Sequence, residues 1–190
     1  FFMVRVGGLA MDRHADSNQF YFENMPPGKQ LREIRKEAKK LMQEAQACFL
    51  DMLQPQLKDE KISILHYDEL NKAQKSRVNA YYKEVIFPVL TPLAFDPGHP
   101  FPYISNLSYN LAIQVQDGDG NIHFARLKVP GTLPHFLPVH KAAYDPMPRV
   151  KKVRKFDFVW ISEVIMANIG ELFPGMKILE VHPFHVVRNA

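Results

Sequence analysis

Histidines are the residues of this 190-residue chain with the widest chemical repertoire, and three of its eight stand where catalysis or metal binding could be argued. His99 lies in a proline-rich loop, where a histidine could act as a general base. Because no serine or cysteine with an activating partner accompanies it, a catalytic role is the less favoured interpretation. His182 and His185 are three apart in a predicted strand, so their side chains should point to opposite faces. That geometry is poor for one metal ion, and we interpret both as ordinary strand residues.

A second candidate site resembles the start of a calcium-binding loop. Asp117, Asp119 and Asn121 match the first three ligand positions. The match then ends, since Ile122 stands where a glycine is needed and Lys128 where a bidentate glutamate belongs. The segment therefore predicts a hairpin turn, and we assign no metal ligands.

A basic run, PRVKKVRK, places five positive charges in eight residues. Such a run could bind phosphate chains electrostatically, although a solvated basic loop is the favoured alternative. Glycine motifs that bind phosphate are missing, because Gly7-Gly8 lacks both the spacing and the lysine that follows in such motifs. The candidate polyanion contacts are Arg149, Lys151, Lys152, Arg154 and Lys155.

Composition bounds the class of protein. Hydrophobic content of 46% and charged content of 23% are typical of a globular chain. The net charge of +4 permits a polyanionic partner without requiring one, and nothing indicates nucleic-acid binding. The single cysteine, Cys48, favours a reducing compartment and a buried structural thiol. No apolar run approaches the roughly 20 residues of a membrane helix. Arg5 interrupts the apolar start, so we expect no signal peptide and a chain that begins inside a longer protein.

The first third of the chain is predicted to be helical. Phe1 to Leu9 is typical of the last turns of a helix that Gly7-Gly8 stops, and residues 11–27 are predicted to be a linker. From Gln30 a long amphipathic helix is expected, which Pro55 should kink or end. Its apolar stripe should pack on the domain's sheet, the favoured partner, or on another subunit. The stripe comprises Leu31, Ile34, Ala38, Leu41, Ala45, Cys48 and Met52, widened by Met42, Phe49 and Leu53.

The remaining elements alternate between strands and helices. Asp68 and Ser162 are the predicted N-caps of two helices, the first with a stripe of Val78, Tyr82, Val85, Ile86 and Val89. Glycines between Tyr109–Gln116 and Ile122–Val129 predict a β-hairpin, with Leu111, Ile113 and Val115 on one face. The pattern favours an α+β domain with a mixed or antiparallel sheet. Further strands are expected at 62–65, 136–139, 156–161 and 177–187.

Several segments resemble, in order, the polyphosphate kinases that work through a phosphohistidine. The longest is VLTPLAFDPGHPFPYISNLSYNLAI, residues 89–113, which resembles the family signature. FFMVRVGGL, ISILHYDEL, FARLKVPGTLPHF and ILEVHPFHVVRNA also match the family. The resemblance covers essentially the whole chain, apart from the predicted linker and the basic run.

The resemblance implies a domain organisation. Residues 1–10 would be a remnant of the N-terminal helical domain, 11–27 a linker, and 28–190 a single head domain with its sheet packed by helices. In the family, the phosphorylated histidine, the magnesium-linked arginines and most ATP contacts lie in C-terminal domains. None has a counterpart here, so no catalytic, cofactor-binding or metal-binding residue is carried over.

The resemblance also implies a role. The intact enzyme would use ATP and magnesium to transfer the terminal phosphate reversibly to inorganic polyphosphate. The present piece would be inactive alone and would serve homodimer contacts and the shape of a basic tunnel. It would be cytoplasmic, with peripheral membrane association left open. The alternative is a stand-alone polyanion-binding or dimerisation module.

Overall fold

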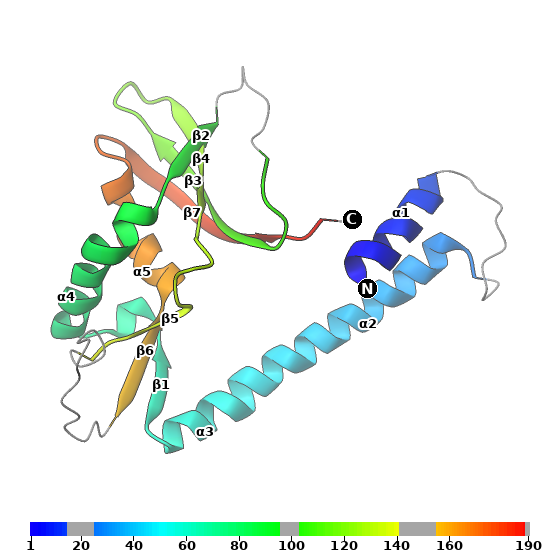
Figure 1. Ribbon diagram of the computed structural model, residues 1–190, viewed down its shortest axis with the longest axis horizontal. Helices are drawn as coiled ribbons and strands as arrows, with labels where there is room; N and C mark the ends of the chain where they lie inside the picture. Colours follow the sequence, from blue (N-terminus) through cyan, green and yellow to red (C-terminus); the bar gives the residue numbers. More distant parts are fainter. Residues whose placement is uncertain (15–24, 96–102, 141–154, 189–190) are drawn as a thin grey trace. The chain divides into compact units, whose positions relative to one another are not determined.

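The computed structural model describes residues 1–14, 25–95, 103–140 and 155–188. The chain divides into two compact units (Figure 1). The helical unit comprises Phe1–Gln56 with Val187–Ala190, and the sheet unit comprises Leu57–Val186. No helix in the described ranges carries an apolar stretch long enough to cross a bilayer.

The N-terminal helix does not stop at its glycines. A π-helical turn, η1 (Phe2–Val6), leads directly into α1 (Gly7–His14). The predicted stop is wrong because Gly7 adopts ordinary right-handed helical angles, φ −58° and ψ −47°. Glycine permits a left-handed stop but does not impose one. Helix α1 packs along α2 (Pro27–Ala47) within the helical unit.

Pro55 does not end the long helix. The helix continues from α2 through a π-helical segment, η2 (Cys48–Leu53), into α3 (Gln54–Asp59). Pro55 has no N–H to donate, and the wider turn before it gives the Gln54 N–H to the Phe49 carbonyl, five residues back. The same solution recurs before Pro88, where the Phe87 N–H bonds to the Tyr82 carbonyl at the end of η4 (Tyr82–Ile86).

The apolar stripe of the long helix is only partly covered. Leu31, Ile34 and Ala38 are half-buried, whereas Leu41 is 63% and Met42 73% exposed. The expected packing of the whole stripe on a sheet is therefore not found. Cys48 lies on the uncovered part and is exposed, so the prediction of a buried thiol is wrong.

The sheet unit contains two sheets. In the smaller one, β6 (Phe156–Trp160) lies between β1 (Ile62–Leu65), to which it is parallel, and β5 (Phe136–Pro138), to which it is antiparallel. The larger sheet is antiparallel, in the order β2-β4-β3-β7. The α+β prediction with mixed and antiparallel pairing is confirmed, although the strands form two sheets. The larger sheet's strands are β2 (Pro92–Phe95), β3 (Ser108–Gln116), β4 (Ile122–Lys128) and β7 (Lys177–Val186).

The core of the sheet unit forms where α4 (Lys72–Tyr81) and η4 meet the inner face of β3. Leu111, Ile113 and Val115 alternate on that face and are at most 2% exposed, as predicted. From the helical side, Val78, Tyr82 and Ile86 are fully buried against them.

Two residues of the predicted helical stripe face outward instead. Val85 is 40% and Val89 49% exposed. The π-helical turn of η4 takes more residues per turn than an α-helix, so the 3.6-residue spacing that placed them inward no longer applies. Val89 ends the short 3₁₀ segment η5 (Phe87–Val89).

Both predicted helix caps are wrong by a few residues. Asp68 lies in the 3₁₀ turn η3 (Tyr67–Glu69), and α4 is capped instead by Asn71. The Gln74 N–H donates to Asn71 Oδ1 at 2.9 Å, and the Asn71 N–H donates to Gln74 Oε1 at 2.9 Å. This reciprocal capping box satisfies two free helix donors, whereas Asp68 could satisfy one. Helix α5 (Ile161–Ala167) begins before Ser162 and has no side-chain cap; the 3₁₀ turn η7 (Ile169–Leu172) follows it.

Candidate functional site

Only one residue of the predicted polyanion contact can be placed. Arg149, Lys151, Lys152 and Arg154 lie outside the described residues. Lys155 precedes β6, and its Nζ lies 3.2 Å from Oδ1 of Asp157, whose side chain is 7% exposed. That oxygen has no well-aligned hydrogen bond, so the ion pair with Lys155 compensates the buried charge. The charge of Lys155 is therefore directed at its own strand.

His99 also lies outside the described residues, whereas Asp117 is fully described and holds the hairpin turn. Its Oδ1 accepts N–H bonds from Asp119 at 3.0 Å and Asn121 at 2.8 Å, and its Oδ2 lies 2.7 Å from His123 Nε2. The hydrogen bond from His123 is the main cause that lowers the pKa of Asp117 to about 2. The predicted β-hairpin is confirmed, and the carboxylate is occupied by its own turn.

A second carboxylate joins β1 to α5. Glu163 Oε1 lies 2.8 Å from His66 Nδ1, and Glu163 Oε2 accepts the Tyr67 N–H at 2.6 Å. The hydrogen bond from Glu163 is the largest cause that raises the pKa of His66 above 6.5. Since His66 also donates its own N–H to Glu69 at 2.6 Å, this histidine is held in the connection between strand and helix.

The C-terminal part of the 89–113 segment is anchored by a buried polar network. Arg126 is 4% exposed and donates from Nε to Oδ1 of the fully buried Asn110 at 2.9 Å. Asn110 donates to Ser108 Oγ at 2.9 Å, and Ser108 donates to the Ser105 carbonyl at 2.6 Å. Lys128 donates to Ser105 Oγ at 3.2 Å. These bonds attach the segment to β4 and give its polar residues a structural use.

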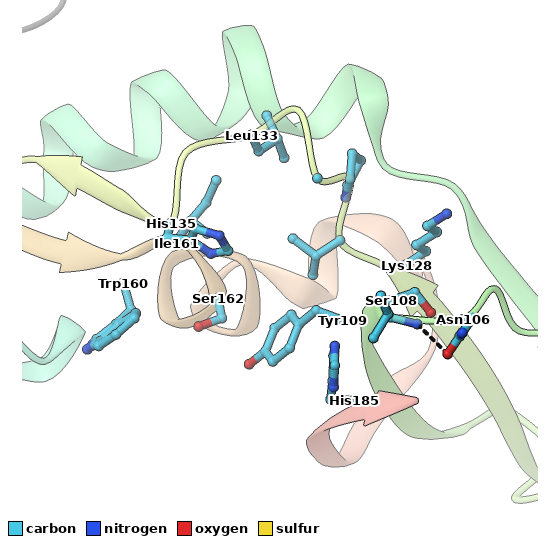
Figure 2. A pocket seen from close by; sticks show the side chains of 14 residues that line it. Asn106, Ser108, Tyr109, Lys128, Leu133, His135, Trp160, Ile161, Ser162 and His185 are labelled. Carbon is cyan, nitrogen blue, oxygen red and sulfur yellow. Dashed lines mark hydrogen bonds between the residues drawn. The ribbon is translucent and has the colours of Figure 1, made fainter. Parts of the chain in front are cut away.

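A pocket of about 520 Å³ opens in the sheet unit near these residues (Figure 2). It lies where β3 begins, β4 ends, β6 passes into α5 and β7 ends. Apolar side chains from five positions line it, and its polar side chains come from all of these elements and their loops. The apolar lining comprises Leu107, Val129, Pro130, Leu133 and Ile161, and the ring-bearing lining Tyr109, His135, Trp160 and His185.

The structure separates the two histidines of β7. His185 is paired across the strands with Tyr109 and lines the pocket. His182 is instead 3.0 Å from Glu180 on the same strand and does not line it. Their expected use as ordinary strand residues fits His182. Sequence reasoning missed the pocket, although the alternation that placed Leu111 inward also places Tyr109 inward.

The comparisons with known proteins agree with one another. The family described as polyphosphate kinase N-terminal domain matches residues 1–65, and polyphosphate kinase middle domain matches residues 73–190. The chain is 39% identical over its whole length to polyphosphate kinase 1 of Chlorobaculum tepidum, and 42% identical to polyphosphate kinase of Synechocystis, covering 27% and 26% of those proteins. The crystal structure of polyphosphate kinase from Porphyromonas gingivalis matches all of the chain and 26% of that protein, with a TM-score of 0.76 and 21% identity.

The chain thus spans about a quarter of the length of the curated relatives it matches. The family matches divide between residues 65 and 73, and the compact units divide at Gln56. The domain boundaries expected from the sequence, at residues 10 and 28, stay a prediction. With both matches together covering nearly every residue, the chain belongs to the polyphosphate kinase family.

Proposed function

We propose that this chain is a non-catalytic part of a polyphosphate kinase. The observation that carries the proposal is its coverage: all of the chain aligns with relatives of which it forms 25 to 27%. The chemistry of such an enzyme would then belong to the rest of the protein, and this part would supply structure and contacts.

The polar side chains of the described residues support this division of labour. His66 bonds to Glu163, His123 to Asp117 and His182 to Glu180. His140 accepts the Asp157 N–H at 3.0 Å. A nucleophilic histidine needs a free ring nitrogen aimed at its substrate, and these four are engaged with neighbours of their own fold.

In the intact enzyme, we propose a reversible transfer of the terminal phosphate of ATP to inorganic polyphosphate through a phosphohistidine. The covalent intermediate splits one transfer into two steps, and magnesium with cationic side chains offsets the phosphate charge. The described residues of this chain would add neither the nucleophile nor the metal ligands. They would add a folded sheet unit and an exposed helical stripe that serves contact with a second copy.

An assay of ATP-dependent polyphosphate synthesis tests the proposal. The 190-residue chain should show no turnover with ATP and magnesium, whereas a full-length relative should show robust synthesis under the same conditions. Robust activity of the chain alone would contradict the assignment.

We propose as a second, separable role that the basic run binds polyphosphate. The contribution falls on Arg149, Lys151, Lys152 and Arg154, because Lys155 is engaged with Asp157. Neutralising those four residues with glutamine should weaken binding and lower its dependence on salt. A matched control neutralises four exposed cations of α2, namely Arg32, Arg35, Lys36 and Lys39. Equal binding by both variants would remove the basic run from this role.

A further inference from the structure

We propose that the pocket at the ends of β3, β4, β6 and β7 binds a nucleotide-sized anion, a planar ring that carries one phosphate group. The pocket is separate from any catalytic step proposed above. Its volume of about 520 Å³ lies within the range of small-molecule sites. The argument rests on the fixed walls of the pocket, its side-chain chemistry and its charge.

The walls are held by the backbone of the fold. The Val129 N–H donates to the Tyr109 carbonyl at 3.0 Å, and the Leu133 N–H donates to the Pro130 carbonyl at 3.1 Å. The Ile161 N–H donates to the His135 carbonyl, also at 3.0 Å. These bonds fix the loop between β4 and β5 against β3 and α5. Such a preformed cavity requires little ordering when a ligand enters.

The ring end of the pocket is formed by Trp160. Its ring lies 4.3 Å from that of Phe136, its cross-strand partner, which holds the indole in place. Ile161 and Leu133 add apolar surface beside it. A planar ring fits this end, because aromatic faces and aliphatic side chains bind it without requiring a set pattern of hydrogen bonds.

Polar groups converge on the middle of the pocket. In the view of Figure 2, Tyr109 and His185 lie between Trp160 at one end and Lys128 at the other. Among the residues that the structure describes, none hydrogen-bonds to the side chains of Tyr109, His135, Ser162 or His185. Several donors from different elements suit a phosphate, which offers three acceptor oxygens.

The charge of the lining favours an anion. Lys128 and two histidines line the pocket, and no carboxylate does. A bare phosphate chain fits poorly, because the lining is largely apolar and its one ammonium group already donates to Ser105. A single phosphate attached to a ring satisfies both the polar middle and the apolar end.

The fluorescence of Trp160 tests the proposal directly, because this is the only tryptophan of the chain. We would titrate the 190-residue chain with AMP, adenosine and inorganic phosphate. AMP should change the emission saturably with a dissociation constant of about 1 mM or tighter, and adenosine and phosphate should each bind about tenfold more weakly. A change that does not saturate, or equal binding of adenosine and AMP, would overturn the proposal.

Paired histidine variants locate the site. His185→Gln and His135→Gln should each weaken AMP binding about tenfold. The control is His182→Gln, three residues from His185 on the same strand but outside the pocket, which should leave binding unchanged. If a histidine variant fails to fold, Ser162→Ala provides a milder test, with an expected loss of about fivefold. Equal binding by His185→Gln and His182→Gln would remove this pocket as the site.

The pH dependence provides a further readout. The titratable groups that face His185 in the pocket are Tyr109, His135 and Lys128. Because histidines gain positive charge as the pH falls toward 5, AMP should bind more tightly near pH 6 than near pH 8. Adenosine, which carries no phosphate, should show no such dependence, and a matching dependence for both ligands would contradict an anion site.

Discussion

Asp117 illustrates how one residue can carry the pattern of a metal ligand and serve a turn instead. Its two oxygens accept from Asp119, Asn121 and His123, all within six residues of the chain. A carboxylate bonded to this many donors is favoured in its charged form, which agrees with its lowered pKa. The aspartate pattern thus predicts chain reversal here.

The first prediction concerns the acid stability of this turn. The pKa of Asp117 falls from 3.8 to about 2 in the folded chain, mainly through the His123 hydrogen bond. A lowered folded-state pKa stabilises the folded state above about pH 4, and this contribution disappears as the pH falls toward 2. Asp117→Asn should therefore destabilise the chain most near neutral pH, with a difference that narrows in acid.

Urea unfolding of both proteins across that pH range measures the difference. Asp119→Asn is the matched control, because Asp119 contributes its backbone N–H to the turn and no printed side-chain bond of the described residues depends on its carboxylate. A difference between wild type and Asp117→Asn that stays constant with pH would contradict the role of the charge.

At the scale of elements, the cap of α4 separates two sequence signals. Asp68 and Asn71 both have side chains suited to a helix N-terminus, and the structure uses Asn71. Asn71→Ala should lower the free energy of unfolding by about 1 kcal/mol, because the Gln74 N–H loses its acceptor. Asp68→Ala should cost roughly 0.5 kcal/mol or less. Chemical denaturation of the two variants decides between them, and the opposite order would contradict the observed cap.

Sequence reasoning predicted the strands well because their signal is local. Leu111, Ile113 and Val115 alternate, and the hairpin after them has glycines at its turn. Helix ends were predicted poorly, since Gly7, Pro55 and Asp68 each permit more than one local solution. Which solution forms depends on hydrogen bonds that a residue pattern does not contain.

The candidate pocket was less accessible to sequence reasoning than the fold. Tyr109, His135, Trp160 and His185 come from four separate segments and meet only after both sheets have formed. Each alone has an ordinary place in a strand or loop. The family resemblance identified the segment 89–113, but the buried network of Arg126 and Asn110 explains how its end is held.

At the scale of the whole molecule, the exposed stripe of α2 indicates where a second copy could bind. Leu41 and Met42 are 63% and 73% exposed, and burial of such side chains drives association. We expect the chain to form a concentration-dependent dimer, and Met42→Lys to weaken it about tenfold. Glu37→Lys, on the polar side of the same helix, is the control. Sedimentation velocity measures all three, and a chain that stays monomeric at every concentration would contradict this contact.

The π-helical turns before Pro55 and Pro88 have a consequence for how the chain tolerates changes in length. Each turn takes up more residues than an α-helical turn does. Deleting one residue from η4 would let an ordinary helix form, and every following position would rotate by about 100° around the axis. Tyr82 would keep its place while Ile86 would leave the core. The length of these helices is therefore constrained as tightly as their composition, and natural insertions or deletions should avoid both turns.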